Sequence, residues 1–174
     1  MKKVLVAYYS RTGYTSAVAR EIARACNADL ESIRDIRGHG TGVGYLRSVF
    51  EAALHTSTNN RRVKNAPEEY ELVIIGTPIW CWNISSPIRA YLETQREHFK
   101  RVAFFCTYGG SGKDKVLREM AALAGKPAVA TMGVSDNEIN QGAHHDKISS
   151  FVSRLGGTSS VPPLRSVTPV AAAK

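Results

Sequence analysis

The sequence predicts an α/β domain in which a five-stranded parallel sheet is covered by helices on both faces. Two observations support this: short, continuously apolar segments alternate with amphipathic segments of helical period, and glycine or polar clusters separate them. The 174 residues are 43% hydrophobic and 22% charged, enough to bury a core without disulfides or a structural metal. We expect a single domain over 1–155. Residues 156–174, rich in Gly, Ser, Thr and Pro, are predicted to be a mobile tail.

Five runs are predicted to be strands, because uninterrupted apolar stretches are typical of strands buried on both faces. The runs are 3–9, 30–33, 70–77, 101–107 and 128–134. The run 70–77 (YELVIIGT) has the clearest strand pattern.

Apolar residues at helical spacing predict five helices between and after these strands. The first carries an apolar stripe over 17–23 and should end at Asn27; the others are expected near 45–55, from Pro87 to 95, over 116–123 and over 146–155. Gly125 should end the fourth helix, and Ser85 or Ser86 should cap the third. Residues 78–86 and 135–144 are expected to be loops.

The net charge is +8, which favours anionic partners such as phosphates or nucleotides. Three cysteines without a C-x-x-C pair argue against a disulfide framework or a zinc ribbon. No apolar run approaches the ~20 residues of a membrane span, and the run 4–9 is too short for a secretory signal. We therefore expect a cytoplasmic protein.

Three segments of unusual composition follow predicted strands, at the sheet edge where ligands bind in parallel α/β folds. The first consists of Ser10, Arg11, Thr12, Gly13, Tyr14 and Thr15. It opens a helix, where free N–H groups and the helix dipole attract anions, and its three hydroxyls can add further donors. This density of hydroxyls favours a phosphate site over an ordinary N-cap turn.

The second segment holds both tryptophans of the chain. It consists of Pro78, Ile79, Trp80, Cys81, Trp82, Asn83 and Ile84. Exposed aromatic faces at a strand end suit a planar heteroaromatic ligand, whereas the alternative is a hydrophobic cluster under the loop.

The third segment is rich in glycine, and consists of Thr107, Tyr108, Gly109, Gly110, Ser111 and Gly112. Its glycines expose backbone amides to a ligand edge, and the tyrosine adds an aromatic face. A tight turn into the next helix is the alternative interpretation.

Several sharper motifs are absent from the sequence. Thr107 and Asp114 stand where a Walker A loop around Gly112 needs glycine and a hydroxyl. The glycines at 38–44 do not fit G-x-G-x-x-G, and no cysteine has arginine six residues later. No metal site is predicted, because the adjacent His144 and His145 are expected to be solvated and poorly placed to share a site.

Taken together, the three segments resemble the flavodoxin-like family that binds FMN. The matching stretches are VLVAYYSRTGYTSAVAREIA, YELVIIGTPIWCWNISSPIRAYL and RVAFFCTYGGSG. The resemblance implies a strand order of 2-1-3-4-5. It also implies that 10–15 hold the FMN phosphate, that 78–84 line the ribityl chain and one ring face, and that 107–112 line the pyrimidine edge.

The chain differs from one-electron flavodoxins in two respects. Those proteins are usually strongly acidic, and many carry a glycine beside the flavin whose peptide flips on reduction. This chain is basic and has no glycine within 78–87, and a non-glycine residue resists positive φ. We therefore favour two-electron chemistry, with NAD(P)H as donor and a quinone-like acceptor. No side chain stands out as a catalytic acid or base, so the flavin would carry the chemistry.

Three alternatives stay open. The chain could be a flavodoxin that carries single electrons between protein partners without a substrate of its own. It could be a basic module that binds nucleic acid through Arg61, Arg62 and Lys64, although no aromatic residues are interleaved there. It could also be a member of the family that no longer binds FMN, although the presence of all three segments argues against this.

Overall fold

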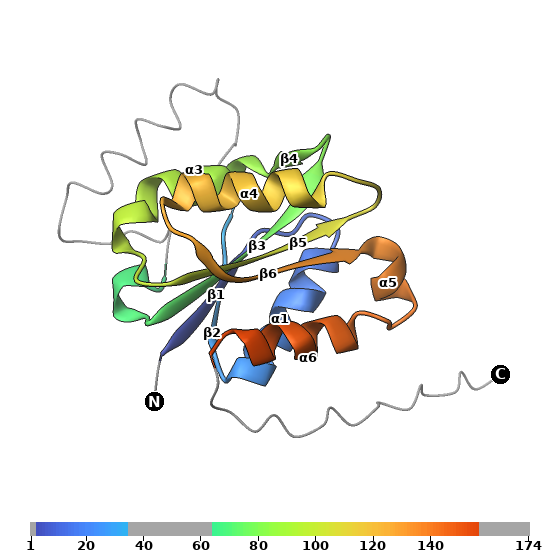
Figure 1. Ribbon diagram of the computed structural model, residues 1–174, viewed down its shortest axis with the longest axis horizontal. Helices are drawn as coiled ribbons and strands as arrows, with labels where there is room; N and C mark the ends of the chain where they lie inside the picture. Colours follow the sequence, from blue (N-terminus) through green and yellow to red (C-terminus); the bar gives the residue numbers. More distant parts are fainter. Residues whose placement is uncertain (1–2, 35–63, 157–174) are drawn as a thin grey trace.

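The computed structural model describes residues 3–34 and 64–156 (Figure 1). The strands are β1 (Val4–Tyr8), β2 (Asp29–Ser32), β3 (Leu72–Trp80), β4 (Asn83–Ile84), β5 (Val102–Tyr108) and β6 (Ala128–Ser135). The helices are α1 (Tyr14–Cys26), α3 (Ser86–Gln95), α4 (Lys113–Ala124), α5 (Asp136–Asn140) and α6 (His145–Arg154). Short 3₁₀ turns lie at Pro67–Glu69 and Arg96–His98.

Five strands pair in parallel in the order β2-β1-β3-β5-β6, which confirms the predicted order. Because parallel neighbours need crossover connections, each of these strands is separated from the next by helix or loop. The central pairing aligns Leu5 with Val73 and Val73 with Val102, and all three side chains are fully buried. The carboxyl ends of β1, β3 and β5 therefore meet at one edge of the sheet.

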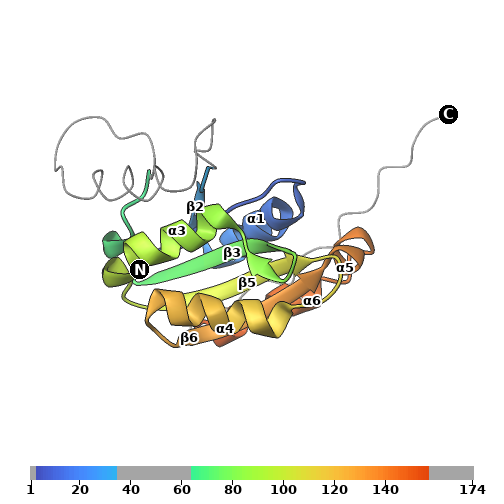
Figure 2. The ribbon, with the colours of Figure 1, turned by 90° about the horizontal axis from the view of Figure 1, so that it is seen from above.

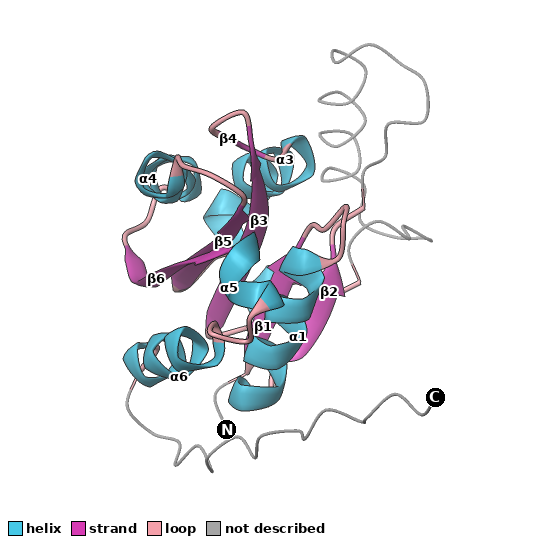
Figure 3. Ribbon diagram, turned by 90° about the vertical axis from the view of Figure 1, so that its right-hand side faces the viewer, coloured by secondary structure: helices cyan, strands magenta, loops and turns pink. Residues whose placement is uncertain are grey.

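Helices cover both faces of the sheet. In Figure 3, α3 and α4 lie on one side and α1 and α6 on the other, and Figure 2 shows α3 and α4 side by side over the strands. Each face has its own hydrophobic cluster, one under α3 and α4 and one under α1 and α6. Because the sheet is buried on both faces, its strands have continuously apolar sequences.

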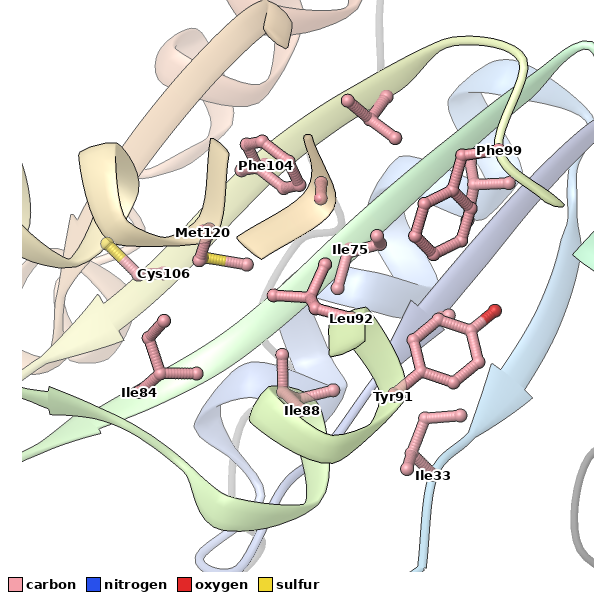
Figure 4. Packing of buried hydrophobic residues seen from close by; sticks show 14 of the residues in the cluster. Ile33, Ile75, Ile84, Ile88, Tyr91, Leu92, Phe99, Phe104, Cys106 and Met120 are labelled. Carbon is pink, nitrogen blue, oxygen red and sulfur yellow. The ribbon is translucent and has the colours of Figure 1, made fainter. Parts of the chain in front are cut away.

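The cluster under α3 and α4 joins both helices to the sheet (Figure 4). Ile88 and Leu92 of α3 and Met120 of α4 are fully buried against Ile75 and Phe104 of the strands. On the opposite face, Gly76 makes room for the Phe105 ring, since a Cβ at that glycine would lie 2.0 Å from Cζ of the ring. Sheet packing therefore demands glycine at this position.

The helix ends follow the predicted signals. Asn27 ends α1 in the left-handed conformation (φ 48°), with its N–H donating to the carbonyls of Ala23 and Arg24. Gly125 ends α4 at φ 64°, and α3 has Ser85 at its N-cap followed by a proline in the first turn.

Two predicted loops contain regular structure. Within 78–86, β3 continues to Trp80 and turns back into β4, which pairs antiparallel with it. Within 135–144, Ser135 and Glu138 form a capping box that starts α5. The S-x-x-E spacing was the local signal for this helix. The prediction that both histidines are solvated is wrong for His144, which is 7% exposed, because it packs at the start of α6 and contacts Glu21 of α1.

Some predictions fall outside the described residues: the helix near 45–55, Arg61 and Arg62, and the tail over 157–174. Lys64 is described, and its backbone N–H donates to Glu31 Oε1 at 2.9 Å. Among the described helices, none has the length and apolarity to cross a membrane. The cytoplasmic location stays a prediction.

Candidate functional site

The first predicted segment forms the turn between β1 and α1. Gly13 sits at the N-cap with φ 100°, a conformation that favours glycine, and a Cβ there would meet nothing within 4 Å. Its N–H donates to Ser10 Oγ at 3.2 Å. No side chain caps the helix, so the first N–H groups of this 13-residue helix stay available to an anionic ligand.

Thr15 differs from the other hydroxyls of this turn. Its side chain is 1% exposed, and its Oγ1 shares a hydrogen bond of 2.8 Å with Oγ1 of Thr107. The pair joins the first segment to the end of β5. Ser10 and Thr12 are the more accessible hydroxyls.

The second segment is a two-residue hairpin between β3 and β4. Cys81 and Trp82 occupy its tip, and both have positive φ, at 47° and 60°. Positive φ at both central residues is the mark of a type I′ turn, where Asn-Gly is the preferred pair. A cysteine and a tryptophan in these positions are strained, and strain of this kind concentrates at functional sites. The turn therefore adopts positive φ without glycine, and the resistance expected of non-glycine residues takes the form of this strain.

Trp80 leans toward the first segment. Its ring meets the Tyr9 ring edge-on, with centroids 5.7 Å apart and an interplanar angle of 88°. The Arg11 guanidinium lies 5.8 Å from the Trp80 ring centroid, within the range of a cation–π contact. Trp80 nevertheless stays 38% exposed.

Trp82 leans instead toward the third segment. Its indole Nε1 donates to Ser111 Oγ at 2.8 Å, and Lys115 Nζ donates to its carbonyl oxygen at 3.2 Å. Gly112, at φ 103°, lies directly beneath the indole: a Cβ there would come within 2.8 Å of Trp82 Cδ1. The ring is thus held in place although it is 60% exposed.

Each pair of segments is therefore in direct contact at one edge of the sheet. The predicted site residues divide by burial. Those with buried side chains are Thr15, Pro78, Ile84 and Thr107. Those partly or fully exposed are Ser10, Arg11, Thr12, Gly13, Tyr14, Ile79, Trp80, Cys81, Trp82, Asn83, Tyr108, Gly109, Gly110, Ser111 and Gly112.

Sequence reasoning missed three residues that border this edge. Tyr9 supports Trp80, and Lys115 supports the hairpin through the Trp82 carbonyl and Asn83 Oδ1. Asp136 of α5 lies close to Gly109, whose Cβ would come 3.3 Å from Oδ2. Asp136 follows the carboxyl end of β6, so the same strand-end rule could have found it.

The cysteines contrast in environment. Burial raises the pKa of the Cys106 thiol to about 12 and that of Cys26 to about 11, so both are protonated and unreactive at neutral pH. Cys81 is exposed at the hairpin tip.

The family model described as Flavodoxin matches residues 3–154. The chain belongs to the flavodoxin family. This confirms the resemblance drawn from the three segments to the flavodoxin-like, FMN-binding family, and it agrees with the strand order. No curated protein is similar enough in sequence to match the chain.

Solved structures share this flavodoxin fold. A flavoprotein from Lactobacillus acidophilus NCFM in complex with FMN is 22% identical, with a TM-score of 0.59 over 81% of this chain and 98% of its own. A WrbA-like flavodoxin from Agrobacterium tumefaciens is 17% identical, with a TM-score of 0.53 over 88% and 96%. The rubredoxin oxygen:oxidoreductase of Desulfovibrio gigas is 18% identical, with a TM-score of 0.55 over 89% of this chain and 36% of its own.

Proposed function

We propose that this flavodoxin binds FMN where the three segments meet and works as a flavin-dependent oxidoreductase that passes electrons from NAD(P)H to a quinone-like acceptor. The observation that carries the proposal is the mutual contact of the segments. Thr15 meets Thr107, Trp80 meets Arg11, and Trp82 meets Ser111. A phosphate-type turn and two exposed indoles thereby share one edge of the sheet.

The residues present fit FMN. The N-terminus of α1, with the Ser10 and Thr12 hydroxyls, would hold the phosphate dianion, and Arg11 adds positive charge. Gly13 and Gly110 leave open space where a Cβ would stand, so a ligand can approach the backbone closely. The exposed indoles offer faces for a flat ring system. When bound, FMN supplies the acceptance and donation of electrons, while the chain orients it.

The positive charge supports a nicotinamide donor, and NADPH in particular, because NADPH carries an extra phosphate. Arg11 and Lys115 both lie beside the aromatic residues of the site. A charge of +8 also differs from the acidic surface that suits docking on basic redox proteins.

The test is titration of the full chain with FMN and with riboflavin, which lacks the phosphate. We expect FMN to bind with quenching of flavin fluorescence and to bind more tightly than riboflavin. Thr12→Ala should reduce the difference between the affinities for FMN and for riboflavin. Ser153→Ala, which removes an exposed hydroxyl from α6, should leave that difference unchanged. Equal affinity for both flavins would refute the phosphate site, and no binding would refute the cofactor.

Anaerobic reduction of the FMN-loaded protein by NADH or by NADPH, followed by addition of a quinone, then tests the reaction. Fast reduction and reoxidation in two-electron steps support the oxidoreductase. No reduction by either nicotinamide overturns it.

The second candidate is a one-electron carrier between proteins. The positive φ of Cys81 and Trp82 favours it, because the backbone conformation that glycine usually supplies is already adopted in this turn. A long-wavelength band of one-electron-reduced flavin during stepwise reduction would support the carrier and count against the oxidoreductase.

A further inference from the structure

A cluster outside the flavin site joins the helices α1 and α6, which lie side by side on one face of the sheet (Figure 3). It consists of Glu21, His144 and His145. Glu21 Oε2 lies 3.2 Å from His144 Nε2, and Glu21 Oε1 lies 2.6 Å from His145 Nδ1. One ligand-type atom from each residue lies within 4.8 Å of the others.

One ring nitrogen of His144 faces a backbone carbonyl and the other faces Glu21. Nδ1 lies 3.4 Å from the carbonyl oxygen of Glu138, and Nε2 is the nitrogen directed at the Glu21 carboxylate. A backbone carbonyl behind one ring nitrogen is the usual arrangement around a metal-binding histidine.

The three side chains converge on one another: the imidazole centroids of His144 and His145 are 4.2 Å apart, and the Glu21 carboxylate faces a nitrogen of each ring. Two imidazole nitrogens and a carboxylate brought together in this way form a ligand set that one divalent cation can bridge.

We propose that Glu21, His144 and His145 bind a divalent transition-metal ion, with Zn²⁺ the best match, and that the ion cross-links α1 to α6. Two imidazole nitrogens and one carboxylate oxygen form a common zinc ligand set, and Zn²⁺ sits about 2.0–2.2 Å from such atoms. In a four-coordinate shell two such ligands lie about 3.2–3.6 Å apart. The three atoms lie within 4.8 Å of one another, and the His145 side chain, 55% exposed, is the one that turns to reach that spacing when the ion binds.

The burial of the cluster suits a site that metal can enter from one side. The side chains of His144 and Glu21 are 9% and 15% exposed, so they form the fixed wall. The more exposed His145 lies on the open side, where water can complete a four-coordinate shell. Lys147, the nearby cation on α6, is engaged with the Glu138 carboxylate at 2.5 Å and with the Gly133 carbonyl.

The experiment is calorimetric titration of the chelator-treated full chain with Zn²⁺, together with thermal unfolding at increasing Zn²⁺, in a Cys81→Ser background that removes the exposed thiol. Zinc should raise the unfolding temperature by an amount that grows with the logarithm of free zinc above its Kd, and Mg²⁺ should not. His145→Ala and Glu21→Gln should each weaken zinc binding by more than about 10-fold. His98→Ala is the matched control, since His98 is exposed and lies 3.8 Å from a single carboxylate, that of Glu68.

The variants His145→Ala and Glu21→Gln also distinguish a metal site from a simple ion pair. Co²⁺ bound by nitrogen and oxygen ligands should give a visible spectrum that His145→Ala weakens at the same Co²⁺ concentration, and this exposed residue can be changed without disturbing the core. Unchanged zinc affinity in His145→Ala and Glu21→Gln overturns the proposal. An unfolding temperature of the wild-type protein that does not change with zinc also overturns the proposal. Glu21, His144 and His145 would then form an ion-paired contact between the two helices.

Discussion

Gly112 beneath Trp82 allows a quantitative test of how the aromatic hairpin is held. Substitution by alanine introduces two separate costs. The first is backbone strain at φ 103°, and the second is a Cβ 2.8 Å from Trp82 Cδ1 and 3.3 Å from Trp82 Cα. Gly13 has nearly the same φ, 100°, with nothing within 4 Å of its Cβ position. Gly13→Ala therefore measures the strain alone.

The expected magnitudes follow from these geometries. A non-glycine residue in the left-handed conformation destabilises the folded state by about 1–2 kcal/mol. Replacing glycine by alanine also lowers the entropy of the unfolded chain, which stabilises the folded state by about 0.4–1 kcal/mol. Gly13→Ala should lower the free energy of unfolding by about 1 kcal/mol. In Gly112→Ala the exposed Trp82 ring can swing outward, and losing its bond to Ser111 adds about 0.5–1.5 kcal/mol. We expect a total loss near 2 kcal/mol.

Urea unfolding without flavin gives these values, and the indole N–H resonance of Trp82 reports its displacement. Gly110→Ala is the neutral control, because its Cβ meets nothing within 4 Å and its φ is not positive. FMN affinity should fall in Gly112→Ala, whereas Gly110→Ala serves as a control for stability alone because Gly110 borders the proposed flavin site. If Gly112→Ala costs no more than Gly13→Ala and the indole resonance does not move, the close packing of glycine and tryptophan is not what holds the ring.

Three further predictions concern stability. Thr15→Val should cost about 1–3 kcal/mol, because it leaves the buried Thr107 hydroxyl without its partner, whereas the double valine variant should be nearly neutral; additive losses in urea unfolding would contradict this. Cys81→Asn with Trp82→Gly should stabilise the chain by about 1 kcal/mol while weakening FMN binding, because relief of two left-handed residues, about 1–2 kcal/mol each, exceeds the lost bond from Trp82 to Ser111, about 0.5–1.5 kcal/mol; no gain in stability from Cys81→Asn alone would show that the turn carries no strain. The Lys147 ammonium, followed by the Ser135 N–H and hydroxyl, lowers the pKa of Glu138 from 4.5 to about 2, so its ionised form stabilises the fold above about pH 4.5. The stability difference between wild type and Glu138→Gln should therefore shrink as pH falls from about 5 to about 2, and a difference constant with pH would refute this linkage.

The sequence by itself determined the order of the five parallel strands and of the helices α1, α3, α4 and α6, and it singled out the three segments of the candidate site. Those signals are local. A strand buried on both faces is apolar without a break, as in 70–77, and helix ends such as Asn27 and Gly125 need a residue that tolerates the left-handed conformation. The three segments could be grouped because parallel strands bring their carboxyl ends to one edge whatever their exact register.

Only the tertiary structure decided which residues meet across that edge and elsewhere. The Trp82 indole packs on Gly112 because β3 turns back into β4, and a turn of two left-handed residues without glycine has no sequence signal. The contact between Glu21 and His144 joins residues far apart along the chain, and the packing of α1 beside α6 sets it. Local patterns report the conformation of neighbouring residues, whereas these contacts depend on sheet register and helix packing, which no short segment encodes.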